Sequence, residues 1–265
     1  MEKKKNFYFK TETEKKDESI EVYIGQSCGK QLSLDIQNAK TEVLIISPYV
    51  DESKIDDLIR LQKKGINAKI AFSSLRPEQK RSVLRKLINQ NQTTNVTAKE
   101  RKEKYEKLLI GFGIALLCLG IYSIYVIYRS HFEKNILNNY SLISLLCFIG
   151  CYFTKKGIDK VRKVNVYDYS YSENINFKYL TSSQEKGMFI HSKIYVIDKK
   201  IAYLGSLNFT NNGFNSNFET RVRITKTDSI NELIEFINLI FEDDYTFDYN
   251  KTWWLGPQVF SEPKY

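Results

Sequence analysis

The residues best suited to chemistry lie in one short stretch late in the chain. Imidazole, ammonium, hydroxyl and amide groups recur there at fixed spacing, and together they suit a phosphate group. The histidine would be the nucleophile, and the other groups would donate hydrogen bonds to the phosphate oxygens. A glycine in the same stretch allows the backbone to approach closely. The residues are His191, Lys193, Asp198, Gly205, Ser206 and Asn208.

A β-hairpin would bring these side chains together. His191 and Lys193 are two residues apart, so on a strand they project from the same face. If residues 199 and 200 form a two-residue turn, the register of the hairpin is fixed by counting outward from it. The predicted pairs are Asp198 with Ile201, Lys193 with Ser206, and His191 with Asn208.

The pattern H-x-K-x4-D-x6-G-S-x-N is similar to the signature of the phospholipase D superfamily, and the similarity extends over residues 188–219. The resemblance implies phosphodiester transfer through a covalent phosphohistidine, with no cofactor and no bound metal. The implied roles are nucleophile for His191, phosphate ligand for Lys193 and Asn208, supporting phosphate donor for Ser206, and orienting residue of the turn for Asp198.

The segment Asn217-Phe218-Glu219 resembles a second part of the family pattern. The resemblance implies that the carboxylate of Glu219 holds the nucleophilic imidazole, which adds Glu219 to the predicted catalytic residues. On a strand Glu219 also shares a face with Arg221 and Arg223, so a surface salt bridge is the alternative interpretation.

Two apolar segments interrupt the chain. Residues 108–128 and 135–154 contain no charged side chain, and each has the roughly 20 residues that cross a bilayer. They are apolar on all sides, which favours transmembrane helices over buried core helices. Basic residues cluster outside both segments, so the predicted topology is a cell-membrane protein with two spans and cytoplasmic N- and C-terminal parts.

Only one copy of the motif is present, although the chemistry requires a second acid to protonate the leaving oxygen. The other histidine, His131, falls in the loop between the predicted spans, across the membrane from His191. A symmetric homodimer would supply the second group, with His191 of each chain meeting near the two-fold axis. Single-motif members of the family are understood to work this way.

The predicted fold class is α/β: a phospholipase D-like mixed sheet flanked by helices and interrupted by an inserted transmembrane helical hairpin. Strands are expected at 43–46 and 66–72, and a helix opens at Pro77. A capping box starts the last long helix at Ser229. That helix is expected to bury Leu233, Phe236, Ile237 and Ile240. The predicted division is a disordered leader (1–19), a first half-domain (20–97), a stalk and hairpin (98–163), and a second half-domain with the motif (164–265).

The composition indicates an anionic binding partner but does not distinguish between nucleic acid and lipid. The net charge of +9 and the pI near 9.1 favour anionic partners, either nucleic acid or a lipid leaflet. The four cysteines form no C-x-x-C pair and only two histidines are present, which argues against a disulfide framework or a zinc site and for a reducing, cytosolic setting.

Three functions are consistent with these features. The first is a membrane-anchored phosphodiesterase that cleaves phospholipid head groups, slightly favoured because the hairpin would confine the site near lipid. The second is a membrane-tethered endonuclease acting on DNA or RNA, to which lysine and arginine would bind through phosphates. The third is a non-catalytic binding module. The pair Trp253-Trp254 would pack on its own domain, enter head groups or stack on bases.

Overall fold

The structure is a computed structural model that describes residues 7–12, 18–130, 134–180, 189–242 and 251–260. The chain divides into two compact units. We call them the sheet unit, which contains the residues up to 91 and those from 171 to 260, and the helical unit, which contains residues 92–170. The sheet unit is therefore built from two segments that are far apart in the sequence.

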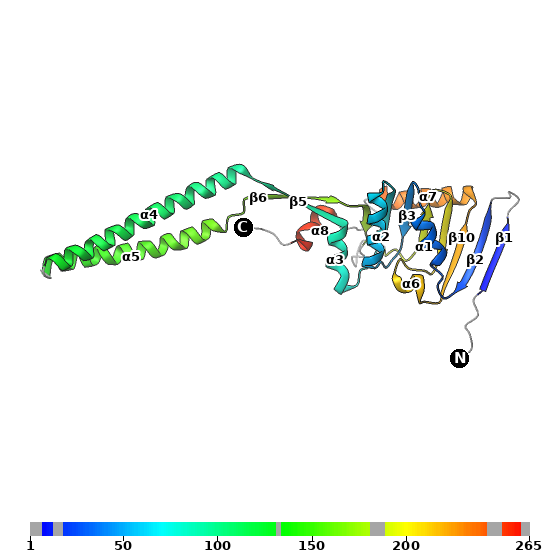
Figure 1. Ribbon diagram of the computed structural model, residues 1–265, viewed down its shortest axis with the longest axis horizontal. Helices are drawn as coiled ribbons and strands as arrows, with labels where there is room; N and C mark the ends of the chain where they lie inside the picture. The colour runs from blue at the N-terminus through cyan, green and yellow to red at the C-terminus, as the bar shows by residue number, and fades with distance from the viewer. Residues whose placement is uncertain (1–6, 13–17, 131–133, 181–188, 243–250, 261–265) are drawn as a thin grey trace, which may run out of the picture. The chain divides into compact units, whose positions relative to one another are not determined.

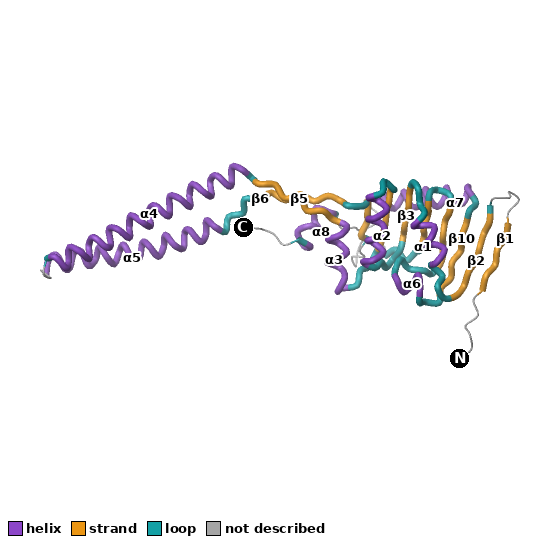
Figure 2. Tube along the Cα trace, viewed as in Figure 1, coloured by secondary structure: helices purple, strands orange, loops and turns teal. Residues whose placement is uncertain are grey.

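An eight-stranded mixed sheet forms the centre of the sheet unit (Figures 1 and 2). Its strand order is β1-β2-β10-β9-β8-β3-β4-β7. The pairs β3–β4 and β4–β7 are parallel, and the other neighbours are antiparallel. The strands are β1 (Phe7–Glu12), β2 (Ser19–Gly25), β3 (Glu42–Ile46), β4 (Asn67–Phe72), β7 (Asn176–Tyr179), β8 (Ile194–Ile197), β9 (Ile201–Gly205) and β10 (Glu219–Ile224).

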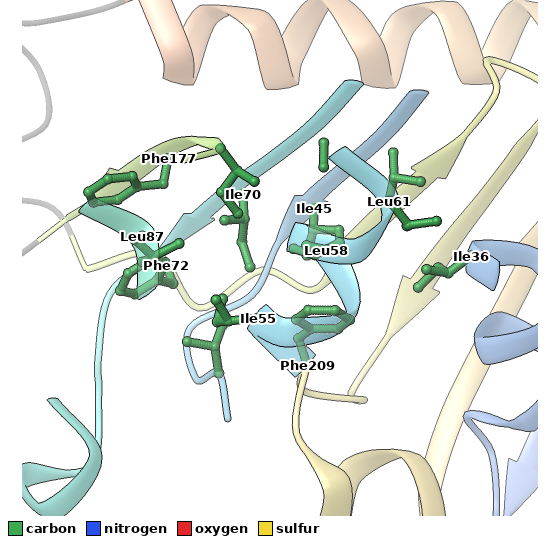
Figure 3. Close-up of a cluster of buried hydrophobic side chains, with 14 of the residues drawn as sticks. Ile36, Ile45, Ile55, Leu58, Leu61, Ile70, Phe72, Leu87, Phe177 and Phe209 are labelled. Carbon is green, nitrogen blue, oxygen red and sulfur yellow. The ribbon is translucent and has the colours of Figure 1, made fainter. Parts of the chain in front are cut away.

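Helices cover both faces of this sheet. Buried side chains of α1, α2, α3, α6 and α8 form one hydrophobic cluster with the sheet, and those of α7 form a second one. In Figure 3, Ile55 and Leu58 of α2 lie near Ile45 of β3 in the first cluster. The helices are α1 (Lys30–Gln37), α2 (Glu52–Lys63), α3 (Pro77–Leu87), α6 (Asn211–Asn215), α7 (Thr227–Glu242) and α8 (Thr252–Val259).

The central strand β3 shows why the sequence requires helices on both faces. Val43 and Ile45 belong to the first cluster, whereas Leu44 and Ile46 belong to the second. Successive side chains of a strand point to opposite faces, so an unbroken apolar run is stable only when both faces are covered. The predicted class, a mixed sheet flanked by helices and interrupted by a helical hairpin, is confirmed.

Part of the segment expected to be a disordered leader is a strand. Phe7–Glu12 forms β1 and pairs antiparallel with β2, with Tyr8 opposite Tyr23. Three consecutive aromatic residues open this segment, and aromatic side chains favour strands. Its charged residues do not prevent pairing at the edge of a sheet, where charges are common.

The last long helix also differs from its prediction. It begins at Thr227, two residues before Ser229, and Phe236 is 47% exposed. The stripe that packs on the sheet instead starts at Ile230 and follows the spacing of three and four residues along one helix face. Phe236 lies outside that stripe, so the prediction that it is buried is wrong.

The helical unit contains two long antiparallel helices, α4 (Val96–Arg129) and α5 (Lys134–Arg162), which include the two predicted spans. Strands β5 (Ile88–Thr94) and β6 (Tyr167–Glu173) pair in a separate two-stranded sheet. The hydroxyls of Ser123 and Ser144 are 2.9 Å apart across the helix pair. Gly113 faces Thr154, and Gly120 faces Cys147, so small residues let the backbones approach closely.

Both helices are long and apolar enough to cross a bilayer, judged by length and composition. Only 11% of the most apolar window of α4 and 17% of that of α5 is buried. The predicted loop position of His131 lies outside the described residues.

Candidate active site

Apart from Asp198, the motif residues lie at one end of the sheet strands. Ile194, the first residue of β8, pairs with Ile46, the last residue of β3. Lys193 therefore lies where the parallel strands β3 and β4 end, and Ser206 follows β9 at the same edge. In open α/β sheets ligands bind outside the carboxyl ends of the parallel strands, so this edge is where a substrate is expected.

The β8–β9 hairpin differs from the predicted register by one residue. Ile197 pairs with Ile201 and Ile194 pairs with Leu204, which leaves a three-residue turn at 198–200. Asp198 and Lys199 both adopt positive φ angles, of 53° and 56°. The predicted pairs of Asp198 with Ile201, Lys193 with Ser206, and His191 with Asn208 are therefore wrong.

Contacts with a distant segment explain why Asp198 belongs to the turn. Its carboxylate accepts hydrogen bonds from the backbone N–H groups of Lys40, Thr41 and Glu42, and from the Thr41 hydroxyl. Burial acts to raise the pKa of Asp198, but these hydrogen bonds outweigh it, so its pKa lies below the ordinary value. Asp198 fixes the turn to the start of β3, at the opposite end of β8 from His191.

His191 and Lys193 are in direct contact. The Lys193 Nζ lies 2.9 Å from the His191 Nδ1 and donates to the His191 carbonyl at 2.7 Å. The imidazole is exposed, whereas Lys193 is only 8% exposed. Burial lowers the pKa of Lys193, and the negative charge of Glu219 opposes that shift without cancelling it. The fold thus holds a largely desolvated cation against an accessible imidazole.

Glu219 forms the second group of contacts. Its carboxylate accepts hydrogen bonds from the Ser206 hydroxyl and, at 3.1 Å, from the Asn217 side-chain amide. Glu219 is 8% exposed, so it is not a surface ion-pair residue. Within the described parts of the chain, no hydrogen bond joins Glu219 to His191, the contact that the resemblance implies.

The two arginines that share its strand face do not pair with Glu219. Arg221 donates to the Cys28 carbonyl at 2.9 Å and lies between the rings of Tyr23 and Tyr203. Arg223 forms ion pairs of 3.2 Å with Glu21 and Asp35. The carboxylate of Glu219 is therefore available for its contacts with Ser206 and Asn217 at the site.

Gly205 and Asn208 complete the motif. A Cβ at Gly205 would collide with the Thr220 carbonyl oxygen, so only glycine allows β9 to approach β10 here. The Thr220 N–H donates to the Ser206 hydroxyl at 3.0 Å, which fixes the position of that side chain. The Oδ1 of Asn208 is buried and has no hydrogen-bond partner among the residues that the structure describes.

Two serines that the sequence analysis did not single out hold the segments that carry the motif. The Ser73 hydroxyl accepts from the Ile190 N–H at 3.0 Å, and the Ser47 hydroxyl accepts from the Phe209 N–H at 2.9 Å. Each serine directly follows a buried parallel strand, Ser47 after β3 and Ser73 after β4. The position of each serine directly after a buried parallel strand is the sequence signal from which its role could have been predicted.

Two aromatic rings beside His191 were also missed in the sequence analysis. The Tyr49 ring lies edge-on to the His191 ring at 6.5 Å, and the Phe189 ring lies 6.1 Å from it. Tyr49 and Phe189 are 41% and 40% exposed. We call these two residues the aromatic rim; it places exposed apolar surface on two sides of the imidazole.

Comparison with protein families matches residues 123–241 to the family described as "Cardiolipin synthase, PLD-like domain". This range includes the whole motif from His191 to Asn208, as well as Glu219. Comparison with curated proteins finds no match.

Several solved structures are similar over most of the chain. The phospholipase D family member Nuc from Salmonella typhimurium is 13% identical, with 88% of this chain and 99% of that chain covered and a TM-score of 0.40. NucT from Helicobacter pylori is 15% identical, with coverages of 93% and 99% and a TM-score of 0.40. Phosphatidylserine synthase from Haemophilus influenzae is 10% identical, with coverages of 89% and 41% and a TM-score of 0.41.

The mixed sheet and the motif at its edge define a phosphodiester-processing α/β domain. The family model of a phospholipase D-like domain matches residues 123–241, and the resemblance of the chain to the phospholipase D superfamily is confirmed. Domains of this superfamily cleave or transfer phosphodiesters.

Proposed function

We propose that this chain is a membrane-anchored phosphodiesterase of the phospholipase D type that cleaves phospholipid head groups through a phosphohistidine on His191. The observation that carries the proposal is the contact between the buried Lys193 ammonium and the exposed His191 imidazole, 2.9 Å apart. A cation held beside a nucleophile can bind a phosphate oxygen while the nucleophile attacks phosphorus.

The position of Lys193 selects the attacking nitrogen. Nδ1 of His191 faces Lys193, so Nε2 is the nitrogen left to attack. Attack requires a free lone pair on Nε2, and the imidazole proton must then be on Nδ1. An ammonium can only donate, so Lys193 must move its hydrogen bond from Nδ1 to a phosphate oxygen when substrate binds. Glu219, whose charge acts on Lys193, is the expected acceptor for the Nδ1 proton.

The reaction then proceeds in two displacements. The Nε2–phosphorus bond forms as the bond from phosphorus to the leaving oxygen breaks, and a general acid protonates that oxygen. Water then attacks the phosphohistidine, which releases a phosphomonoester and restores the imidazole. Lys193, Ser206 and Asn208 would donate to the phosphate oxygens through both steps, with the amide of Asn208 as its donor.

The general acid is proposed to come from a second copy of the chain. His131 is the only other histidine in the sequence and falls between the two proposed spans. A two-fold homodimer would place the partner copy's equivalent of His191 across the substrate, so that one imidazole attacks while the other protonates the leaving group.

Two observations support phospholipid as the substrate. The matching family is described as a cardiolipin synthase domain, which points to lipid phosphodiesters. Helices α4 and α5 carry many exposed apolar side chains, such as Leu117, Ile121 and Phe148. An isolated helix pair with apolar residues on its outer surface is stable in lipid and not in water, so the pair is proposed to span the membrane with both outer ends cytoplasmic.

The aromatic rim favours nucleic acid as the alternative substrate. Tyr49 and Phe189 are exposed beside His191, and bases stack on such rings. The net charge of +9 would attract a polyanion. The alternative function is a membrane-tethered, metal-independent endonuclease on DNA or RNA.

The deciding experiment uses the purified full chain in detergent with EDTA. Its substrates are fluorescent phosphatidylglycerol and phosphatidylcholine in vesicles, and single-stranded DNA and RNA. Wild type is expected to release lipid head groups, and His191→Ala to release none. His131→Ala removes the other histidine and is expected to keep activity.

Cleavage of nucleic acid alone would replace the lipid proposal with the nuclease. Lack of cleavage of every substrate by wild type, both with EDTA and with magnesium in its place, would leave a binding module. Loss of activity on adding EDTA, with recovery on adding magnesium, would overturn the metal-independent mechanism.

A further inference from the structure

A cavity of about 410 Å³ in the sheet unit is lined by residues of α1, α2 and α6 and by residues next to them. Ile36, Leu61 and Phe209, which are labelled in Figure 3, form part of its wall. Its volume is within the usual range of about 300–1,000 Å³ for small-molecule sites. None of the motif residues, all of which the structure describes, lines it. The cavity is therefore not part of the candidate active site.

Lys54 of α2 is a buried cation in the cavity wall. The residue is only 8% exposed, and its Nζ lies 4.0 Å from the centre of the Phe214 ring. The ion pair between Lys54 and Asp57 spans 3.8 Å, which is longer than a hydrogen bond. An ammonium has three N–H donors, and in the described parts of the chain no group accepts a hydrogen bond from that of Lys54.

The surroundings of Lys54 do not fully compensate for its burial. Burial lowers the pKa of Lys54, and the negative charges of Asp57 and Asp51 oppose that shift without cancelling it. A buried charge without hydrogen bonds is unfavourable, because it has lost its contacts with water. An anion in the cavity would replace those contacts, since a carboxylate or phosphate oxygen accepts strong hydrogen bonds from an ammonium.

Two further cations line the same cavity. Arg60 and Lys64 follow Lys54 along α2 and at its end, and both are exposed. Asp57, which pairs with Arg60, is the one acid among the described residues of the lining. Lys64 forms no ion pair with any residue that the structure describes. The lining thus carries three cations and one carboxylate, which favours an anionic occupant.

We propose that this cavity binds a small molecule that carries a carboxylate or a phosphate, with Lys54 as its principal hydrogen-bond donor. The oxyanion accepts from the Lys54 ammonium, while Arg60 and Lys64 attract it by their charge. Ile36 and Leu61 are buried in the cavity wall and provide apolar surface for the carbon part of the ligand.

The proposed site borders the segment that carries the motif. Phe209 lines the cavity and directly follows Asn208 in the sequence. The backbone carbonyl of Phe209 accepts from the Asp51 N–H at 3.2 Å, so this part of the wall is fixed to the start of α2. The inference does not rest on the phosphodiesterase activity proposed for His191, because no group of that mechanism holds the ligand.

The test is calorimetric titration of the purified full chain in detergent. The probes are inorganic phosphate and benzoate, which present the two kinds of oxyanion separately. Lys193→Met serves as the background, because it removes a proposed phosphate ligand of the active site and leaves the cavity intact. This background is expected to retain binding. Adding Lys54→Met is expected to weaken binding at least about tenfold, the effect of losing hydrogen bonds to a charged group.

Two neighbouring lysines provide a matched pair of variants. Lys63 and Lys64 are both exposed at the end of α2, but Lys64 lines the cavity and Lys63 does not. Lys64→Gln is expected to weaken binding about two- to fivefold, the effect of one exposed charge, and Lys63→Gln to leave it unchanged. This pair keeps the test decisive if Lys54→Met does not fold, which a urea titration would show.

Three results would overturn the inference. Dissociation constants above about 10 mM for both probes, in wild type and in Lys193→Met, would show that only water occupies the cavity. Equal binding by Lys193→Met with and without Lys54→Met would place the anion elsewhere. Equal weakening by Lys63→Gln and Lys64→Gln would indicate attraction by the general surface charge and not by this site.

Discussion

The hydroxyl of Ser73 accepts a 3.0 Å hydrogen bond from the backbone N–H of Ile190, the residue before His191. A matching bond of 2.9 Å joins Ser47 to the N–H of Phe209, the residue after Asn208. Both serines are buried. The ends of two neighbouring parallel strands therefore position the two segments that carry the motif.

Removing either hydroxyl is expected to destabilise the fold and the site together. Ser73→Ala and Ser47→Ala would each leave a buried backbone N–H without a partner, at a cost of about 1–3 kcal/mol. The loss of free energy of unfolding can be measured by urea titration, and kcat/KM is expected to fall with it. The exposed Ser53→Ala in α2 is the matched control, expected to stay within about 0.5 kcal/mol of wild type. An unchanged stability of both buried variants would show that neither bond contributes.

The pH dependence of activity should report on Lys193. Burial lowers the pKa of Lys193, and the proposed phosphate binding needs the ammonium. Activity is therefore expected to fall as the pH rises through this lowered pKa, with a midpoint below about 10.4, the ordinary value for lysine. The measurement is kcat/KM against pH. Lys193→Arg is the control, because a guanidinium stays charged and should remove the alkaline limb if activity remains.

Glu219 is expected to affect the pH midpoint of the alkaline fall in kcat/KM. Its negative charge stabilises the Lys193 ammonium, so Glu219→Gln is expected to move the alkaline midpoint to lower pH. The midpoint is the informative quantity, because loss of the Ser206 and Asn217 contacts would also reduce the rate. A midpoint that stays in place, or moves upward, would contradict a Coulombic link between the two residues.

Asp198 is expected to act on stability and not on chemistry. The pKa of its carboxylate is lowered in the folded chain, so its contribution is present above about pH 4 and is lost as the pH falls through the folded pKa. Asp198→Asn should lose about 1.5–3 kcal/mol at neutral pH, the range for hydrogen bonds to a charged group. Asparagine tolerates the positive φ at this position, so the turn itself should persist.

Urea titrations of wild type and Asp198→Asn between neutral and acidic pH check this prediction. The difference in stability should shrink as the pH falls. Where both proteins are folded, the variant should keep kcat/KM within about tenfold of wild type, since it leaves the reacting groups in place. A complete loss of activity in a folded variant would instead assign Asp198 a direct part in catalysis.

Mixed dimers test the proposal that two chains share one active site. If one site needs His191 from both chains, an equal, fully exchanged mixture of wild type and His191→Ala should retain about one quarter of the activity of the same total amount of wild type. Independent sites would retain about one half. A mixture of wild type with Lys30→Glu should keep full activity and controls for the exchange procedure.

The contrast between predictable and unpredictable features is clear at the β8–β9 hairpin. The alternating and continuous apolar patterns of the sequence predicted both strands of the hairpin. Such patterns depend only on which of a few consecutive side chains are buried. The register could not be predicted from the turn residues. It depends on hydrogen bonds from residues 40–42 to Asp198, which lies more than 150 residues away in the sequence.

The same distinction applies to Glu219. Its strand position suggested either a catalytic carboxylate or a surface ion pair with a neighbouring arginine. The structure buries it against Ser206 and Asn217, and it gives both arginines other partners. The choice among partners at similar sequence distance is made only when β9, β10 and α1 pack together.

By itself, the sequence determined the chemical groups of the site, the two apolar helices and the α/β class. Each of these depends on residue types at short, fixed spacing, which local geometry converts directly into structure. Only the tertiary structure decided the hairpin register, the partners of Glu219, and the anchoring of the motif by Ser47 and Ser73. Those features are contacts between segments separated by the helical unit, and their energies depend on distances that no local pattern encodes.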